Sequence, residues 1–501
     1  MNTPTFLPRV AAADLDSPFA WHDGEPISVR QFLADASRQA GLLPADGPMI
    51  NLCTDRYLFA VAFAAALIRG QTCLLPPDAL PNTLARLRTM PGAGAVSGVG
   101  SGNESSNADA SHEAYGLTDD PALKPSGLPV AMVQVDRESA AITSSVPRIH
   151  ANRLAAVLLT SGSTGTPTPH AKTFGTLMLN IAAEARRLAE LLERPSLAGV
   201  TIVATVPPQH SYGFESSVLL AMLGGAAIDS GRPYYPADIA TALSRVPRPR
   251  ALVTTPFHLK ALLQADVVLP NVELVLSATA PLSPQLALQA ERRFGGKLIE
   301  IYGCTEAGQV ATRRPVQSEV WHTFDGLQIR REPSSDADAV PAEPLLAAGG
   351  STYHATDHAP DCFIVEGGHV IVPTPLADIL QLEDATRFRL LGRANDLIHV
   401  AGRRSSLAHL DHHLNSIEGV EDGAFWMPPE RVDSVVRPVA FVVAPALTDA
   451  QIAGALRVRL EAVFVPRRIV RLPSLPREAT GKLTRQTLAR LAAEHGLTPS
   501  P

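Results

Sequence analysis

The sequence predicts an α/β protein, because short apolar runs alternate with longer amphipathic segments along most of the chain. Runs of strand length include LAAVLL, VTIVATV, RALVTT, VELVLSA and KLIEIYG. Segments with helical spacing, such as FHLKALLQ and PQLALQAERRF, follow several of them. The chain has 501 residues, of which 46% are hydrophobic and 18% charged, so it is long enough for two or more domains.

The pattern of predicted strands and helices changes near residue 393, where we expect a domain boundary. A strand, a polar turn and another strand, FRLLGRANDLIHVAGRRSS, lead into a smaller α+β segment. That segment reads as the helix AHLDHHLNSIEGV, the strand VRPVAFVVAP, the helix DAQIAGALRVRLEAVF, the strand RRIVRLP and a closing loop and helix. We therefore predict a large N-terminal domain over residues 1–392 and a small C-terminal domain over residues 393–501.

Charge and cysteine usage restrict the function. A formal net charge of -6 disfavours a nucleic-acid-binding protein. The N-terminus lacks the basic start and apolar core of a signal peptide. The longest apolar run, residues 58–70, is too short to span a bilayer and predicts a buried helix. The cysteines lie far apart without a CxxC pair, which indicates reduced thiols in a cytoplasmic protein.

The stretch LLTSGSTGTPTPHAKTF, residues 158–174, places glycines and hydroxyl side chains directly after an apolar strand. Glycines let backbone N–H groups approach an anion, hydroxyls donate hydrogen bonds, and a lysine balances charge, so the stretch predicts a polyphosphate-binding loop. It matches neither a Walker A motif nor a nucleophile elbow, and a plain turn between strand and helix fits it equally well. The candidate ligands are Thr160, Ser161, Gly162, Ser163, Thr164, Gly165 and Lys172.

With later stretches added, the pattern becomes more specific. LTSGSTGTP resembles the phosphate loop of the adenylate-forming superfamily, which includes acyl- and aryl-CoA synthetases, adenylation domains of peptide synthetases, and luciferases. Further stretches match that family in the right order: VPPQHSYGFE (206–215), SATAPLS (277–283), EIYGCTEAG (300–308), LLGRANDLIHVAGRR (390–404) and PREATGKLTR (476–485). The resemblance implies a large multi-subdomain N-terminal domain, a small mobile C-terminal domain, and the use of ATP and Mg²⁺ to activate a carboxylic acid.

The resemblance also implies roles at the nucleotide. Glu306 would hold Mg²⁺ and Thr305 would hydrogen-bond the α-phosphate, while Lys482 would stabilise the charge that develops during adenylation. Further nucleotide contacts are implied for Thr279, Ala280, Pro281, Tyr302, Gly303, Asp378, Arg393 and Arg404. Without the family, Lys482 reads as a solvated charge, Tyr302 as a core aromatic and Glu306 as a helix cap.

The same resemblance places the acid and the hinge. His210 would lie beside the acid's carboxylate, in a pocket lined by Tyr212, Gly213, Phe214, Ala278 and Gly303. A histidine satisfied within its own loop is the alternative for His210. Tyr234 and Tyr235 are candidates for binding a ring hydroxyl, or are surface tyrosines. Asn395 would be the hinge about which the small domain rotates before a thiol attacks the adenylate.

Departures from the family pattern narrow the assignment. Thr168 stands where the loop usually has a lysine, so Lys172 is its predicted substitute, and Asp378 is aligned by its neighbours alone. The PxPHxK loop, HSYGFESS and GRPYYPADI resemble the AMP-ligases of aryl polyene and xanthomonadin pigment clusters. That branch implies a small aromatic acid such as 4-hydroxybenzoate and an acyl carrier protein as the thiol acceptor.

Several alternatives stay open. An aryl- or acyl-CoA ligase would use coenzyme A as acceptor, and the basic run Arg467, Arg468 and Arg471 would meet an acidic carrier protein if one is used. A stand-alone amino-acid adenylation enzyme would need an acidic partner for the ammonium group, and Glu215 is the nearest carboxylate. A non-catalytic acyl- or nucleotide-binding relative is supported only by the missing loop lysine.

Overall fold

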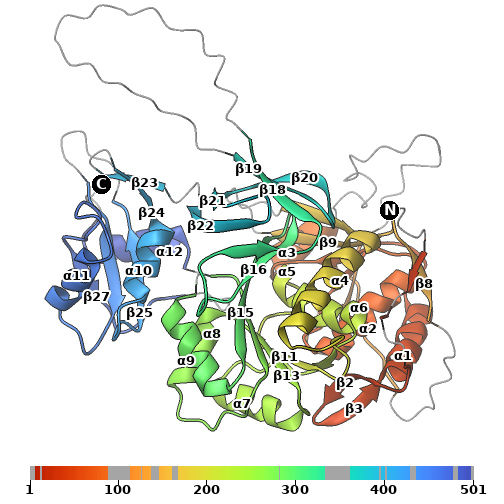
Figure 1. Ribbon diagram of the computed structural model, residues 1–501. Helices are drawn as coiled ribbons and strands as arrows, with labels where there is room; N and C mark the ends of the chain where they lie inside the picture. The colour runs from red at the N-terminus through yellow and green to blue at the C-terminus, as the bar shows by residue number, and fades with distance from the viewer. Residues whose placement is uncertain are drawn as a thin grey trace, which may run out of the picture. The chain divides into compact units, whose positions relative to one another are not determined.

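The structure is a computed structural model, and its described residues form two compact units (Figure 1). The N-terminal unit comprises Met1–Ser318 and Phe324–Gly326; the C-terminal unit comprises Glu319–Thr323, Leu327–Arg477 and Leu483–Pro501. The predicted boundary at residues 392/393 falls inside the C-terminal unit, and it stays a prediction about which segment moves as one body. The structure describes residues 6–8, 10–11, 14–88, 113–123, 125, 127–136, 146–160, 168–280, 282–332, 362–393, 397–400, 403–428, 436–477 and 483–497.

A mostly parallel sheet forms the centre of the N-terminal unit. In sheet order its strands are β16 (Gly308–Arg313), β15 (Lys297–Cys304), β14 (Leu274–Ser277), β13 (Arg250–Thr254), β11 (Thr201–Ala204), β12 (Ala227–Asp229), β2 (Pro18–His22) and β3 (Glu25–Ser28). Strands β15 to β2 run parallel, β16 pairs antiparallel with β15, and β3 pairs antiparallel with β2. The predicted strands VTIVATV, RALVTT, VELVLSA and KLIEIYG are confirmed as β11, β13, β14 and β15.

Helices cover both faces of this sheet (Figure 1). Because strand side chains alternate between faces, Leu252 and Val275 pack against α7 (Pro236–Arg245), α8 (Pro256–Gln264) and α9 (Pro284–Phe294). Their neighbours Val253 and Leu276 pack on the opposite side, against α2 (Arg56–Arg69), α4 (Phe174–Leu191) and α6 (Leu220–Gly224). Burial of both faces explains why these strands read as continuous apolar runs.

A second sheet completes the N-terminal unit. Its order is β10 (Thr168–Thr173), β9 (Leu154–Thr160), β5 (Cys73–Leu75), β4 (Met49–Asn51), β6 (Tyr115–Thr118) and β7 (Val130–Met132). Helices α1 (Val29–Leu42) and α3 (Pro81–Arg88) and the short pair β1 (Phe6–Pro8) and β8 (Arg148–His150) complete its elements. The buried helix predicted at residues 58–70 is α2, which is capped by Asp55 and ends at Gly70 with a left-handed φ of 78°.

The C-terminal unit contains several small sheets. They are β18 (Leu327–Glu332), β19 (Cys362–Gly367) and β20 (Val370–Leu376); β23 (Leu397–Val400) and β24 (Arg403–Ser406); and β25 (Asp422–Trp426), β26 (Val439–Val443) and β27 (Ile469–Arg471). In addition, β17 (Trp321–Thr323), β22 (Arg387–Arg393) and β21 (Asp378–Leu382) pair antiparallel in this order. Helices α10 (Leu407–Asn415) and α11 (Asp449–Arg457) pack on one face of the sheet of β25 to β27 and α12 (Arg485–Glu494) on the other. The predicted helices and strands of this segment are confirmed, and β25 was not predicted.

The predicted α/β class is confirmed, with a large N-terminal part and a smaller C-terminal part. In the described part of the chain, no helix combines the length and apolar content that a membrane crossing requires.

Candidate active site

The predicted phosphate loop is bounded by an antiparallel hairpin. Thr160 at the end of β9 pairs with Thr168 at the start of β10, so the two ends of the loop meet as cross-strand partners. Because β10 lies between this stretch and α4, the stretch joins two strands instead of a strand and a helix, and its role as a phosphate loop stays a prediction. Five of the predicted loop ligands lie outside the described residues: Ser161, Gly162, Ser163, Thr164 and Gly165.

Two side chains of β10 reach the turn that carries Glu306. Residues two apart in a strand share a face, and here they are His170 and Lys172. The Lys172 ammonium donates a hydrogen bond to the Glu306 carbonyl oxygen at 2.9 Å. The His170 Nε2 atom lies 3.1 Å from the Thr160 hydroxyl and 3.7 Å from a Glu306 carboxylate oxygen. No sequence motif assigns a role to His170, so its position here is known only from the structure.

The turn itself joins β15 to β16. Gly303 pairs with Gln309 and Cys304 with Gly308, so Thr305 and Glu306 sit at the tip of a tight hairpin. A strand follows, not a helix, so the alternative of Glu306 as a helix cap is wrong. A Cβ on Gly303 would lie 2.3 Å from the Gly308 carbonyl oxygen, which explains the glycine by close packing.

The chemistry of this turn fits a magnesium ion shared with a nucleotide. The Glu306 side chain is 49% exposed, so its carboxylate is accessible to a ligand. Mg²⁺ is commonly held by one or two carboxylates, with substrate phosphates and water supplying the other ligands. Among the described residues there is no cluster of three or more metal-ligating side chains, and such a cluster is not what a phosphate-bridged ion needs.

The predicted adenine motif follows the end of β14. Ala278 is buried, and Thr279 adopts a left-handed φ of 81°. A β-branched residue rarely takes this conformation, which costs about 1–3 kcal/mol and persists where surrounding structure imposes it. Strain of this kind concentrates at functional loops, in keeping with a nucleotide contact. Pro281 lies outside the described residues, and the stacking of the buried Tyr302 on adenine stays a prediction.

His210 stands at the start of an irregular helix. It precedes α5 (Ser211–Gly213), which continues as the π-helix Phe214–Leu219 and then as α6. π-Helical turns are rare and frequently occur at functional sites. Phe214 is fully buried, with its ring edge-on to Phe63 at 5.1 Å, so its predicted contact with substrate remains untested.

A buried polar cluster lies beneath this helix. The Glu215 carboxylate, 2% exposed, accepts a hydrogen bond from the Ser211 hydroxyl at 3.1 Å. The Gln309 amide donates to the Ser216 hydroxyl at 2.9 Å. The remaining members are Lys172, Asn180, Glu184 and Tyr212.

Burial shifts the pKa values of the ionisable groups in this cluster. Burial raises the pKa of Glu184 to about 8, although the nearby Ser216 and Gln309 partly oppose this. Neither Glu184 oxygen, nor the Tyr212 hydroxyl, makes a hydrogen bond of standard geometry with a described residue. Burial also lowers the pKa of Lys172, opposed mainly by Glu215. The sequence signal for this cluster is only a polar pair, Asn180 and Glu184, four residues apart on α4, which is common on any helix.

Candidate residues of the C-terminal unit are only partly described. Asp378 and Arg393 are cross-strand partners in β21 and β22, so the structure brings these two predicted nucleotide ligands together. Asn395 and Lys482 lie outside the described residues, as do the side chains of Arg393 and Arg404.

The predicted ring-hydroxyl ligands belong to the N-terminal unit. The Tyr234 ring lies edge-on to those of Tyr235 and His258, at 5.3 and 5.0 Å. Both tyrosines are exposed, and their predicted contact with a substrate ring stays a prediction.

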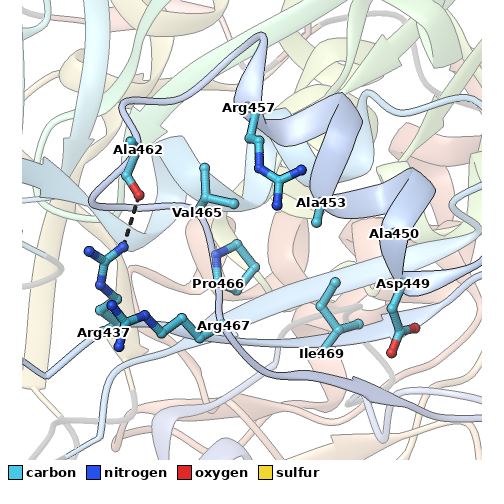
Figure 2. A pocket seen from close by; sticks show the side chains of 10 residues that line it. All are labelled: Arg437, Asp449, Ala450, Ala453, Arg457, Ala462, Val465, Pro466, Arg467 and Ile469. Carbon is cyan, nitrogen blue, oxygen red and sulfur yellow. Dashed lines mark hydrogen bonds between the residues drawn. The ribbon is translucent and has the colours of Figure 1, made fainter.

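The predicted basic run borders a hollow of about 640 Å³ in the C-terminal unit (Figure 2). Arg468 donates to the His495 carbonyl oxygen, and Arg471 lies 3.4 Å from Asp449, so both are engaged within the fold. Arg467 lines the hollow with Arg437 and Arg457, and Figure 2 shows the Arg457 guanidinium pointing into it. Neither Arg457 nor Arg467 has a carboxylate within ion-pair distance in the described part of the chain.

Comparison with known proteins adds a family context. A family model described as AMP-binding enzyme matches residues 11–326. The 4-coumarate–CoA ligase of Halorhodospira halophila is 31% identical over 334 residues, covering 65% of this chain and 73% of that protein. The corresponding ligase of Rhodobacter capsulatus is 30% identical over 307 residues, covering 61% and 68%.

Solved structures support the fold. The O-succinylbenzoate coenzyme A synthetase of Bacillus subtilis, in complex with ATP and magnesium ion, superimposes with a TM-score of 0.72 at 18% identity. The match covers 97% of this chain and 100% of that one.

Proposed function

The chain belongs to the AMP-binding enzyme family and is an acid–thiol ligase, and from this premise we propose that it activates a compact aromatic acid, such as 4-hydroxybenzoate, and loads it onto an acyl carrier protein. The observation that carries the proposal is that Thr160, His170 and Lys172, at the ends of the phosphate loop, lie together with the turn that carries the exposed Glu306 carboxylate. Two 4-coumarate–CoA ligases among the relatives support an aromatic acid.

The first half-reaction joins the acid to AMP. A carboxylate oxygen attacks the α-phosphorus of ATP, and the bond to pyrophosphate breaks. Glu306 would hold Mg²⁺, which neutralises phosphate charge when bound. Thr305 and the loop beginning at Thr160 would hydrogen-bond the phosphates, and Lys482 would stabilise the charge that develops between acid and phosphate. His210 would orient the carboxylate, with Tyr212, Gly213, Phe214, Ala278 and Gly303 around the ring.

The nucleoside would be held by further residues of the motifs. Tyr302 would cover the adenine, and the backbone of residues 279–281 would contact its edge. Asp378 and Arg393, which are cross-strand partners, would hold the ribose hydroxyls. These roles follow the family resemblance, and the strained backbone at Thr279 supports a functional loop at this position.

The second half-reaction transfers the acyl group to a thiol. The thiol sulfur attacks the acyl carbon, and AMP leaves with its phosphate charge, which Arg404 would face. Rotation of the small domain about Asn395 would withdraw Lys482 from the active site and bring in the residues that act in the second half-reaction. Arg457 and Arg467, which have no ion-pair partner among the described residues, favour an acidic carrier protein as acceptor; coenzyme A is the alternative. A cytoplasmic location, which the free cysteines support, belongs to the proposal.

The test is pyrophosphate release with MgATP across benzoic, cinnamic, amino and fatty acids. We expect release with 4-hydroxybenzoate, and a loss of about 10²–10³-fold in Lys482→Ala with an unchanged circular dichroism spectrum, because a charge stabiliser is removed. Release only with fatty or amino acids would contradict the aromatic substrate, and no release with any acid would favour the non-catalytic alternative. Mass spectrometry of acylated carrier protein, against chromatography of acyl-CoA, then decides the acceptor.

A further inference from the structure

We propose that Glu215 and Lys172 are positioning residues: the buried Glu215 carboxylate compensates the Lys172 ammonium, and this ammonium fixes the turn that presents Glu306. The inference deepens the proposed function and rests on its use of MgATP at Glu306. It assigns Lys172 a role different from direct contact with the β- and γ-phosphates, which the sequence predicts.

The buried Lys172 side chain contacts the turn that carries Glu306. Lys172 is 8% exposed, and its ammonium donates to the main-chain carbonyl of Glu306 at 2.9 Å. A hydrogen bond from a charged donor to a backbone acceptor fixes the turn and leaves the Glu306 carboxylate itself uncommitted to the lysine. The carboxylate can then face a ligand while its backbone is held.

The positive charge of the buried Lys172 ammonium needs compensation by a nearby negative charge. An ammonium this far from water is stable only with an opposite charge nearby. Burial lowers the pKa of Lys172 and raises the pKa of Glu215, and the opposite charge of each residue opposes the shift of the other. The two side chains form no direct ion pair: both are buried, and their hydrogen bonds go to Glu306 and Ser211 respectively.

Lys172 and Glu215 link three elements of the site. Lys172 belongs to β10, which closes the phosphate loop, and Glu215 belongs to the π-helix that follows His210. The carbonyl that Lys172 binds belongs to the β15–β16 turn. Buried charges therefore set the Glu306 turn relative to the elements predicted to hold the phosphates and the acid. Loss of either charge should weaken metal-dependent nucleotide binding, while metal-free nucleotide binding should be retained.

The experiment compares Lys172→Met, Glu215→Gln and the double variant. Calorimetry measures binding of a non-hydrolysable ATP analogue with and without Mg²⁺, and pyrophosphate release gives the Mg²⁺ concentration for half-maximal rate. We expect each single variant to raise that concentration about tenfold and to weaken analogue binding only when Mg²⁺ is present. The double variant should lose no more than the worse single variant, because both substitutions break one interaction.

The matched control is Lys297, a lysine that also donates a hydrogen bond to a main-chain carbonyl but lies away from the phosphate loop. Lys297 donates to the Leu191 carbonyl oxygen at 2.7 Å and to Glu193 at 3.1 Å, near the surface. Lys297→Met should change thermal stability alone and leave the Mg²⁺ dependence as in the wild type.

Three results would overturn the proposal. Equal loss of analogue binding with and without Mg²⁺ would make Lys172 a phosphate ligand, and a lowered melting temperature with unchanged Mg²⁺ dependence would make the charges merely structural. Additive single effects would also overturn it. If Lys172→Met does not fold, Glu215→Gln alone decides, since the proposal requires its Mg²⁺ effect. If no acid supports turnover, the proposed function fails while analogue binding still tests this inference.

Discussion

Glu184 has no accessible surface, and no oppositely charged group contacts it in the described part of the chain; these two facts determine its protonation. Moving a carboxylate out of water costs several kcal/mol, so burial raises the pKa of Glu184 to about 8 from an ordinary value of 4.5. The neutral acid is thus the native form near neutral pH. Its position on α4, beside Ser216 and Gln309, places it in the cluster that also contains Glu215.

We predict that Glu184→Gln flattens the pH dependence of stability. A group with a raised native pKa contributes stability that is complete below pH 4.5 and is lost as the pH rises through about 8. At pH 9 the wild type should therefore be less stable than the variant by a few kcal/mol. Urea unfolding from pH 5 to 9 measures this, and Glu190→Gln, at an exposed position of α4, controls for the lost charge. Parallel pH curves for wild type and Glu184→Gln would contradict the prediction.

Motif residues and buried polar residues differ in how far the sequence reveals them. Glu306 and Lys172 stand in recognisable motifs, and a hydrogen bond joins the two residues. His170 gains a role only from its contacts with Thr160 and Glu306, and Glu184 only from its burial, which depends on the packing of α4 against the π-helix. That packing joins segments far apart in the chain, so local periodicity does not contain it.

At the scale of elements, hairpins were harder to predict than βα units. The apolar runs of the parallel sheet have period and length that identify them. β10 and β16 are partly polar, and each follows a turn of three to seven residues after a buried strand, so the sequence favoured a helix or an open loop there. The missed strand β25, with the sequence DGAFW, is similarly short.

A second prediction concerns the helix that begins at His210. A Cβ on Gly213 would lie 2.0 Å from the Pro207 carbonyl oxygen, so Gly213→Ala must displace the turn before His210. Overpacking of this kind costs about 1–3 kcal/mol. We expect a lower urea midpoint and a raised KM for the acid, with the KM for MgATP little changed.

Gly41→Ala in α1 is the matched control. A Cβ there meets nothing within 4 Å, so the variant should be neutral or stabilised by up to about 1 kcal/mol. An unaltered KM for the acid in Gly213→Ala would show that the turn before His210 does not contact the acid.

At the scale of the whole molecule, fold class followed from the sequence more readily than the division into units. Alternating apolar and amphipathic segments predict α/β packing wherever they occur. Near this point the chain passes between the two units more than once: Glu319–Thr323, which contains β17, belongs to the C-terminal unit, whereas Phe324–Gly326 belongs to the N-terminal unit. Composition does not change at that point, because β-strands on both sides have similar side chains.

The hinge prediction can be tested by separating the two half-reactions. Proline fixes φ near −65° and restricts the preceding residue, so Asn395→Pro should hinder rotation about this position. We expect single-turnover pyrophosphate release to stay within about twofold, while thioester formation falls by about tenfold or more, because only the second step requires the rotation. Asn395→Ala removes the same side chain without fixing φ and should retain both steps. Equal losses in both half-reactions would place residue 395 in the adenylation machinery, and no loss in either would move the hinge elsewhere, for which the division of the chain near residues 318–327 gives the next position to test.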